Sequence, residues 1–262
     1  MLLALDARNG FVTLGFREGG TWLVRRSFGV PQGRSADEYA LLFSLTESAI
    51  VSPGLKSAVD RAILSSVVPA LTAPLVAAVA SAFGVEVRVV GPGLRTGLRI
   101  RSDLPQELGS DIVCCAVAAR AMIPSRPCVI IDFSDALVFS ALNSAGDFLG
   151  AAIAPGKEAS SRGLHESAAL LPVVGTSAPL HAIGRNTQAS IQSGLYHGFS
   201  GLVERLSTLF RIELEEPDHP AASIEILATG RGAGRDFVRT LVPSREVDDL
   251  ALEGLAIIDA LR

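Results

Sequence analysis

Three aspartates stand at positions where a protein could bind or transfer phosphate. Asp6 and Asp132 each end a short apolar run and are each followed directly by a tight turn. Carboxylates at the ends of buried strands can hold hydrated magnesium, while the backbone N–H groups of such turns can face phosphate oxygens. Asp111 precedes an apolar stretch, 112–122, that favours a helix. Its position suits a cap for that helix, and aspartate is also a residue type that can accept a proton as a general base.

The same order of elements surrounds Asp6 and Asp132, because each half of the chain opens with a strand, an acid, a turn and two more strands. The Asn9-Gly10 pair after Asp6 predicts a hairpin turn with left-handed backbone. In the first half we expect strands at 2–5, 11–16, 21–28, 62–68 and 85–90, and helices at 36–45 and 69–83. In the second half we expect strands at 128–131, 136–142, 148–154 and 224–228, and helices at 157–169, 187–211 and 248–261.

The repeat predicts an α/β fold of two lobes, 1–120 and 121–262, with the boundary near 118–126. Each lobe would hold a mixed sheet flanked by helices, and the terminal helix can pack back on the first lobe. Two such lobes placed face to face would leave a nucleotide cleft lined by their first turns. The alternative is an unrelated α/β protein that happens to contain two hairpins.

Composition excludes several other classes of protein. Hydrophobic residues make up 48%, charged residues 19%, and the net charge is −4, which indicates a large core and no nucleic-acid partner. The three cysteines lack Cys-x-x-Cys spacing and the four histidines are far apart, so neither a disulfide framework nor a zinc site is expected.

The uncharged stretch 67–85 is rich in alanine and interrupted by proline, which favours a buried helix over a membrane span. With no basic leader at the N-terminus, we expect a cytoplasmic protein that does not bind membranes.

Six segments, in the same order and at similar spacing, resemble those of type III pantothenate kinases. They are Arg-Ser-Ala-Asp-Glu-Tyr at 34–39, Ser-Ser-Val-Val-Pro at 65–69, Gly-Pro-Gly-x-x-Thr-Gly-Leu at 91–98, Asp-Leu-Pro-Gln-Glu-Leu-Gly-Ser-Asp at 103–111, Gly-Ala-Ala-Ile-Ala-Pro-Gly at 150–156, and Gly-Arg-Asn-Thr at 184–187 with glycines at 194 and 198. The resemblance implies the duplicated RNase H-like fold of actin-like ATPases, with a mixed five-stranded sheet flanked by helices in each lobe. It also implies ATP-dependent phosphorylation of the pantothenate hydroxyl, the first step toward coenzyme A. Magnesium, a monovalent cation (K⁺ or NH₄⁺) and a homodimer are implied as well.

The resemblance also assigns roles to individual residues. Asp111 matches the general base of the family. The nucleotide-binding positions are Asp6, Arg8, Asn9, Gly10, Ser134, Asp135, Thr229 and Gly230. The substrate-binding positions are Gly93, Thr96, Gly97, Gly109, Ile112 and Thr187. Asp6 and Asp132 match the acids that hold the metal ion in the family.

Both phosphate loops depart from the family pattern. The first, Asp-x-Gly-Asn-Thr in the family, has Arg8 for its glycine and Gly10 for its threonine. The second, Asp-Phe-Gly-Thr-Ala-Thr-Thr, reads Asp-Phe-Ser-Asp-Ala-Leu-Val at 132–138, and Asp135 adds a negative charge where the triphosphate would lie. A Cβ obstructs close approach of phosphate to the backbone, and like charges repel it. One hypothesis is that Arg8 and Asp135 pair across the cleft at the γ-phosphate position; the other is that both point into solvent.

Two further departures concern the acceptor and the adenosine. Ile112 stands where the family has an arginine that reaches the pantothenate carboxylate, and Arg231 replaces a glycine near the adenosine. Three functions therefore stay open. The chain is an active pantothenate kinase, a catalytically inactive binding or regulatory protein of the Bvg accessory factor type, or a kinase for a different small acceptor.

Overall fold

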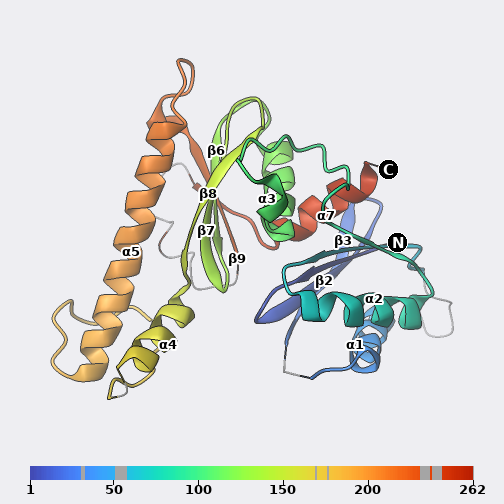
Figure 1. The fold of residues 1–262 in the computed structure, drawn as a ribbon, viewed down its shortest axis with the longest axis horizontal. Helices are drawn as coiled ribbons and strands as arrows, with labels where there is room; N and C mark the ends of the chain where they lie inside the picture. The colour runs from blue at the N-terminus through green and yellow to red at the C-terminus, as the bar shows by residue number, and fades with distance from the viewer. Residues whose placement is uncertain are drawn as a thin grey trace. The chain divides into compact units, whose positions relative to one another are not determined.

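The chain divides into two units, each built around one five-stranded sheet (Figure 1). A computed structural model describes residues 1–30, 33–50, 58–168, 170–175, 177–230, 237 and 244–261. The first unit comprises 1–98, 103–121 and 249–262, and the second comprises 99–102 and 122–248. The first unit therefore contains the terminal helix as well as the N-terminal sheet.

The sheet of the first unit has the strand order β3-β2-β1-β4-β5. Its strands are β1 (Leu2–Ala7), β2 (Phe11–Glu18), β3 (Thr21–Gly29), β4 (Arg61–Ser66) and β5 (Val87–Val89). β1 is antiparallel to β2 and parallel to β4, and all six of its residues are buried. A central strand covered on both faces explains why the sequence reads here as a continuous apolar run and not as an alternation.

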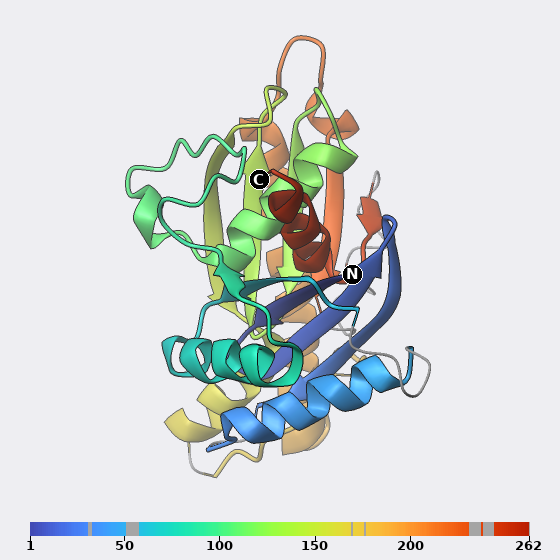
Figure 2. The ribbon, with the colours of Figure 1, turned by 90° about the vertical axis from the view of Figure 1, so that its right-hand side faces the viewer.

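Helices cover both faces of this sheet (Figure 2). On one face, α1 (Ala36–Ser48) and α2 (Pro69–Phe83) pack on Leu3, Leu5 and the alternate residues of β2. On the other face, α7 (Leu250–Ala260) packs on β1 and β4, and α3 (Ser110–Met122) packs on α7. At this helix contact Gly254 lies directly against the carbonyl of Cys114, where a Cβ would not fit.

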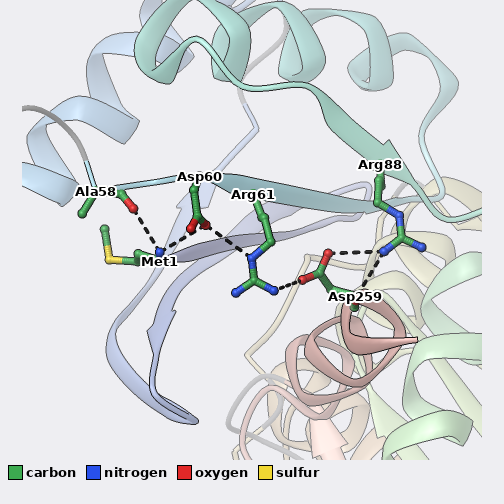
Figure 3. A network of polar contacts seen from close by, with 6 residues as sticks. All are labelled: Met1, Ala58, Asp60, Arg61, Arg88 and Asp259. Atoms are coloured by element: carbon green, nitrogen blue, oxygen red, sulfur yellow. Dashed lines mark hydrogen bonds and ion pairs between the residues drawn. The ribbon is translucent and has the colours of Figure 1, made fainter. Parts of the chain in front are cut away.

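A network of charges fastens α7 to the sheet (Figure 3). The Asp259 carboxylate is 1% exposed and accepts hydrogen bonds from Arg61 Nη1 at 2.7 Å and Arg88 Nη1 at 3.3 Å. These arginines lie on β4 and β5 respectively. Next to Arg61, at the start of β4, the Met1 amine donates to Asp60 Oδ1 at 3.2 Å. The last helix is thus an integral part of the first unit.

The second unit repeats the strand order of the first, as β10-β9-β6-β7-β8. Its strands are β6 (Cys128–Phe133), β7 (Ala136–Leu142), β8 (Phe148–Pro155), β9 (Glu225–Gly230) and β10 (Ser244–Glu246), and its helices include α4 (Lys157–Ser167) and α5 (Thr187–Glu213). β6 is antiparallel to β7 and parallel to β9, and Phe199 and Val203 of α5 pack on the sheet. The predicted duplication of a mixed five-stranded sheet is confirmed.

The predicted left-handed turn at Asn9-Gly10 is wrong, because neither residue has a positive φ. The register of β1 and β2 ends at the pair Ala7–Val12, and Arg8 N donates to Phe11 O at 2.8 Å. Four residues therefore span the reversal. Loops of this length are most often built around a type I turn, which needs no positive φ.

The uncharged stretch at 67–85 forms α2, of which Leu75, Ala78 and Val79 are buried. The expected buried helix therefore buries one face only. Across the described ranges, no helix combines the length and apolar character needed to cross a membrane. The three cysteines are buried and form no disulfide.

Candidate functional site

Asp6 lies at the carboxyl end of β1, on the face opposite the α1–α2 core. Its side chain is 5% exposed, and its Oδ2 accepts a hydrogen bond from Arg8 Nε at 2.7 Å. Its other oxygen, Oδ1, is buried without a hydrogen-bond partner among the described residues. A buried carboxylate oxygen that accepts nothing is costly, and such an atom is a candidate for a ligand or water.

Asp111 is in the first turn of α3, and Arg8 reaches it as well. Arg8 Nη1 lies 3.8 Å from Asp111 Oδ2, and the arginine side chain is 8% exposed. The second carboxylate oxygen, Oδ1, accepts the backbone N–H of Ile112 at 2.8 Å. One guanidinium thus brings together two acids that are far apart in the sequence.

Gly109 fixes the position of the Asp111 carboxylate. A Cβ added at Gly109 would lie 2.5 Å from Asp111 Oδ1, well inside normal contact. Beside it, Ser110 Oγ lies 3.0 Å from Ser65 Oγ, and Ser65 is paired with Asp6 in the β1–β4 register. The sequence reading missed this serine pair, although Ser65 ends an apolar run as Asp6 does.

Cys114 lies one turn along α3 from the same acids. Burial raises the pKa of its thiol well above the ordinary range, and the charges of Asp6 and Asp111 raise it further. The thiol therefore stays protonated and acts as a small apolar group beneath the acids.

The metal implied by the resemblance fits this unit through Asp6. No group of three or more His, Cys, Asp or Glu side chains is arranged to hold a metal in the described ranges. Magnesium, however, often keeps most of its waters and uses only one or two carboxylates together with substrate phosphates. The free Asp6 Oδ1 can accept a metal-bound water, whereas Oδ2 is already engaged by Arg8.

In the second unit, Asp132 occupies the position at the end of β6 that Asp6 has at the end of β1. It is buried, and its Oδ1 accepts a hydrogen bond from Ser134 Oγ at 2.5 Å. The β6–β9 register places Thr229 beside it. Gly230 has φ +98°, and a Cβ there would lie 2.7 Å from Asp132 Oδ1. The structure thus brings together four residues that the sequence reading assigned to nucleotide or metal.

The predicted second phosphate loop, residues 132–138, makes a tight turn against the start of α4. Ser134 N donates to Ala136 O, and Gly156 N donates to Asp135 O, each at 3.2 Å. A Cβ on Gly156 would lie 2.5 Å from Asp135 O, so glycine is required there by close approach. Ser134 has no positive φ, so replacing the family glycine does not strain the backbone. Asp135 itself is exposed.

The predicted substrate residues fall into three places. Gly93 and Gly97, both with positive φ, lie with Thr96 in one loop of the first unit, where Thr96 Oγ1 accepts from Leu98 N at 3.3 Å. Gly109 and Ile112 flank Asp111.

Thr187 is an exposed residue at the start of α5, which belongs to the second unit. The Arg8–Asp135 pair joins residues of different units and stays a prediction. Arg231 lies outside the described residues.

Comparisons with known proteins agree over most of the chain. A family model described as type III pantothenate kinase matches residues 2–208. A type III pantothenate kinase from Dehalococcoides mccartyi is 36% identical over 258 residues, covering 98% of this chain and 96% of the relative. One from Pelobacter propionicus is 39% identical over 266 residues, covering 98% of each.

Solved structures are similar at the level of the fold. A Campylobacter jejuni protein described as a Baf family transcriptional activator aligns with a TM-score of 0.57 at 16% identity, covering 99% of this chain and 98% of that one. A Sinorhizobium meliloti protein described as a 2-dehydro-3-deoxygalactonokinase aligns with a TM-score of 0.53 at 12% identity, covering 100% of this chain and 99% of that one.

Proposed function

Because this chain belongs to the type III pantothenate kinase family and has the duplicated RNase H-like fold of actin-like ATPases, we propose that it transfers the γ-phosphoryl group of ATP to the primary hydroxyl of pantothenate. The observation that carries the proposal is the buried Asp6 Oδ1, which has no hydrogen-bond partner among the described residues and lies in the same unit as the partly exposed Asp111 carboxylate. Phosphoryl transfer needs little covalent chemistry from the protein, and depends instead on placed charges and one group that orients the nucleophile.

The surroundings of Asp111 support its proposed role as the general base. The Ile112 N–H donates to its Oδ1, and the absence of a Cβ at Gly109 leaves room for that oxygen. The Asp111 side chain is 16% exposed, so an acceptor can reach it. In the proposed reaction the acceptor hydroxyl gives its proton to this carboxylate as its oxygen attacks the γ-phosphorus, and the bond from that phosphorus to the β–γ bridging oxygen breaks to release ADP. Asp6 Oδ1 would hold a water of magnesium, whose charge when bound neutralises the phosphate oxygens.

Ile112 bears on how tightly the acceptor should bind. It stands where the family arginine would form a bidentate pair with the pantothenate carboxylate, and an isoleucine makes no such bond. We therefore expect weak binding of pantothenate, with a high KM. A small acceptor without a carboxylate is the related alternative.

A second candidate function is binding without turnover. It is favoured by Arg8, which is buried at a position where the family has glycine and pairs with both acids. The similar Campylobacter jejuni protein carries a regulatory description, as a transcriptional activator. On this reading the chain would be a regulatory protein of the Bvg accessory factor type.

A cytoplasmic homodimer is also proposed for this chain. Large apolar side chains are exposed in the second unit, with Leu170 at 97%, Leu180 at 89% and Ile183 at 82%. Burial against a second copy would remove this surface from water. Sedimentation of the purified chain tests this, and a monomer at all concentrations would contradict it.

Titration calorimetry followed by an acceptor panel tests the proposed function. We expect the wild-type chain and Asp111→Asn both to bind ATP with magnesium, because the proposed base acts on the acceptor hydroxyl and not on the nucleotide. Wild type is then incubated with ATP and either pantothenate or small hydroxy compounds without a carboxylate. Binding without any product would favour the second candidate, and no heat at millimolar ATP would exclude a kinase.

A further inference from the structure

Arg8 is a buried cation between two buried or half-buried carboxylates. Its Nε lies 2.7 Å from Asp6 Oδ2 and its Nη1 lies 3.8 Å from Asp111 Oδ2. The guanidinium is permanently charged and its N–H groups form a rigid fork, so it can serve two carboxylates at once. The arrangement compensates part of the negative charge of the two acids within the protein itself.

The chemistry of this contact matches what a metal ion would supply. Two carboxylates that contact the same guanidinium repel one another and attract positive charge, including that of a divalent cation. Here a positive charge of the chain already lies against both acids. A divalent cation that approached Asp6 Oδ1 would meet the guanidinium on the neighbouring oxygen of the same carboxylate.

We propose that Arg8 is a resident cation that replaces part of the charge of a divalent metal at Asp6 and Asp111. Without nucleotide, this site then binds a divalent cation only weakly. Removing the positive charge of Arg8 uncovers a divalent-cation site on these two acids. The inference uses the acids of the proposed function but does not require that the chain turn over ATP.

Manganese serves as the probe, because free and bound Mn²⁺ are distinguished directly by electron paramagnetic resonance. The titration is made on the full chain without nucleotide and without pantothenate. We expect Arg8→Gly to bind Mn²⁺ at least about tenfold more tightly than wild type, since a unit charge a few ångströms away is removed. The double variant Asp6→Asn with Arg8→Gly is expected to lose that gain.

Two further variants separate charge from packing. Arg8→Lys keeps the positive charge and is expected to bind Mn²⁺ as weakly as wild type. Arg26→Ala removes an arginine from the exposed part of β3 and changes the net charge equally, so it should leave Mn²⁺ binding unchanged. These controls exclude a general effect of net charge.

Arg8→Gly removes the arginine that pairs with the buried Asp6 carboxylate, and this loss can prevent the protein from folding. Arg8→Gln is therefore measured in parallel, because its amide is neutral but can still donate to Asp6. Tighter Mn²⁺ binding by either folded neutral variant supports the inference. Wild-type-like affinity in the folded neutral variants, or tight Mn²⁺ binding by wild type itself, would overturn it. A failed kinase assay neither supports nor overturns this inference, because the Mn²⁺ titration contains no nucleotide.

Discussion

Replacing Gly109 by alanine should displace the proposed catalytic base without unfolding the chain. The added Cβ would lie 2.5 Å from Asp111 Oδ1, whereas ordinary contact begins at 3.4 Å, so the carboxylate must retreat by about 0.9 Å. The other atoms near this Cβ are the Asp111 carboxyl carbon and a methyl of Val67, both at 3.5 Å or more. The movement is therefore taken up by the short Asp111 side chain and not by backbone.

A shift of this size is large for a group that accepts a proton. A misplacement of about 1 Å can lower a rate roughly 10²-fold. We therefore expect the kcat of Gly109→Ala for pantothenate phosphorylation to fall about 10²-fold. The affinity for ATP should stay at the wild-type value, because Gly109 contacts the base and not the phosphate loops.

The assay is the rate of ATP consumption at saturating pantothenate, with thermal unfolding measured on the same samples. Gly29→Ala is the matched control, since no atom lies within 4 Å of a Cβ there and its φ is not positive. Full kcat in folded Gly109→Ala would refute the reasoning, because the carboxylate position would then not matter. A loss of kcat that accompanies unfolding would refute the assignment of the strain to Asp111 alone.

Three further predictions concern the fold around the site. Asp259→Asn should lower the free energy of unfolding by about 1.5–3 kcal/mol, the usual range for a hydrogen bond to a charged group. The loss stays in this range because Arg61 and Arg88 lose the carboxylate but are exposed enough to be hydrated. Urea unfolding measures the change, and an unchanged free energy would mean that this network does not stabilise the packing of α7. Burial raises the pKa of Cys128 to about 12, so its thiol should stay unreactive toward Ellman's reagent at pH 8 until the protein is unfolded, and rapid labelling of the native protein would contradict this. The hydrogen bond from the N-terminal amine lowers the pKa of Asp60 below 3.8, so its contribution to stability is present above that value and lost as the pH falls through the folded pKa. The difference in Tm between wild type and Asp60→Asn should therefore be seen at pH 7 and vanish in acid. A difference that grew as the pH fell would contradict a lowered pKa for Asp60.

The sequence predicted the sheets well, because their central strands are unbroken apolar runs such as 2–5 and 128–131. It did not predict β10, since three residues, Ser244–Glu246, are too few to show a period. The network at Asp259 was also missed. Its partners Arg61 and Arg88 are far from it in sequence, and only the packing of α7 on the sheet brings them together.

The site was predictable only in part. Resemblance to a family identified Asp6 and Asp111 as functional, but no periodicity or spacing in the sequence places one beside the other. The conformation of Arg8 could not be inferred either, because a long side chain in a turn can reach several acids. Arg8 is buried against Asp6 and Asp111, although Asn9 and Gly10 of the same turn are exposed. Gly109 was assigned to substrate by resemblance, whereas its close contact with Asp111 becomes visible only in three dimensions.

The account is tested most directly by mass-spectrometric detection of 4′-phosphopantothenate formed from ATP and pantothenate by the purified chain. We expect wild type to accumulate more product than there is enzyme present, and Asp111→Asn to form roughly 10²–10⁴-fold less, as for the loss of a general base. No product from wild type at millimolar substrates, or equal product from Asp111→Asn, would contradict the proposal that this chain is a pantothenate kinase with Asp111 as its base.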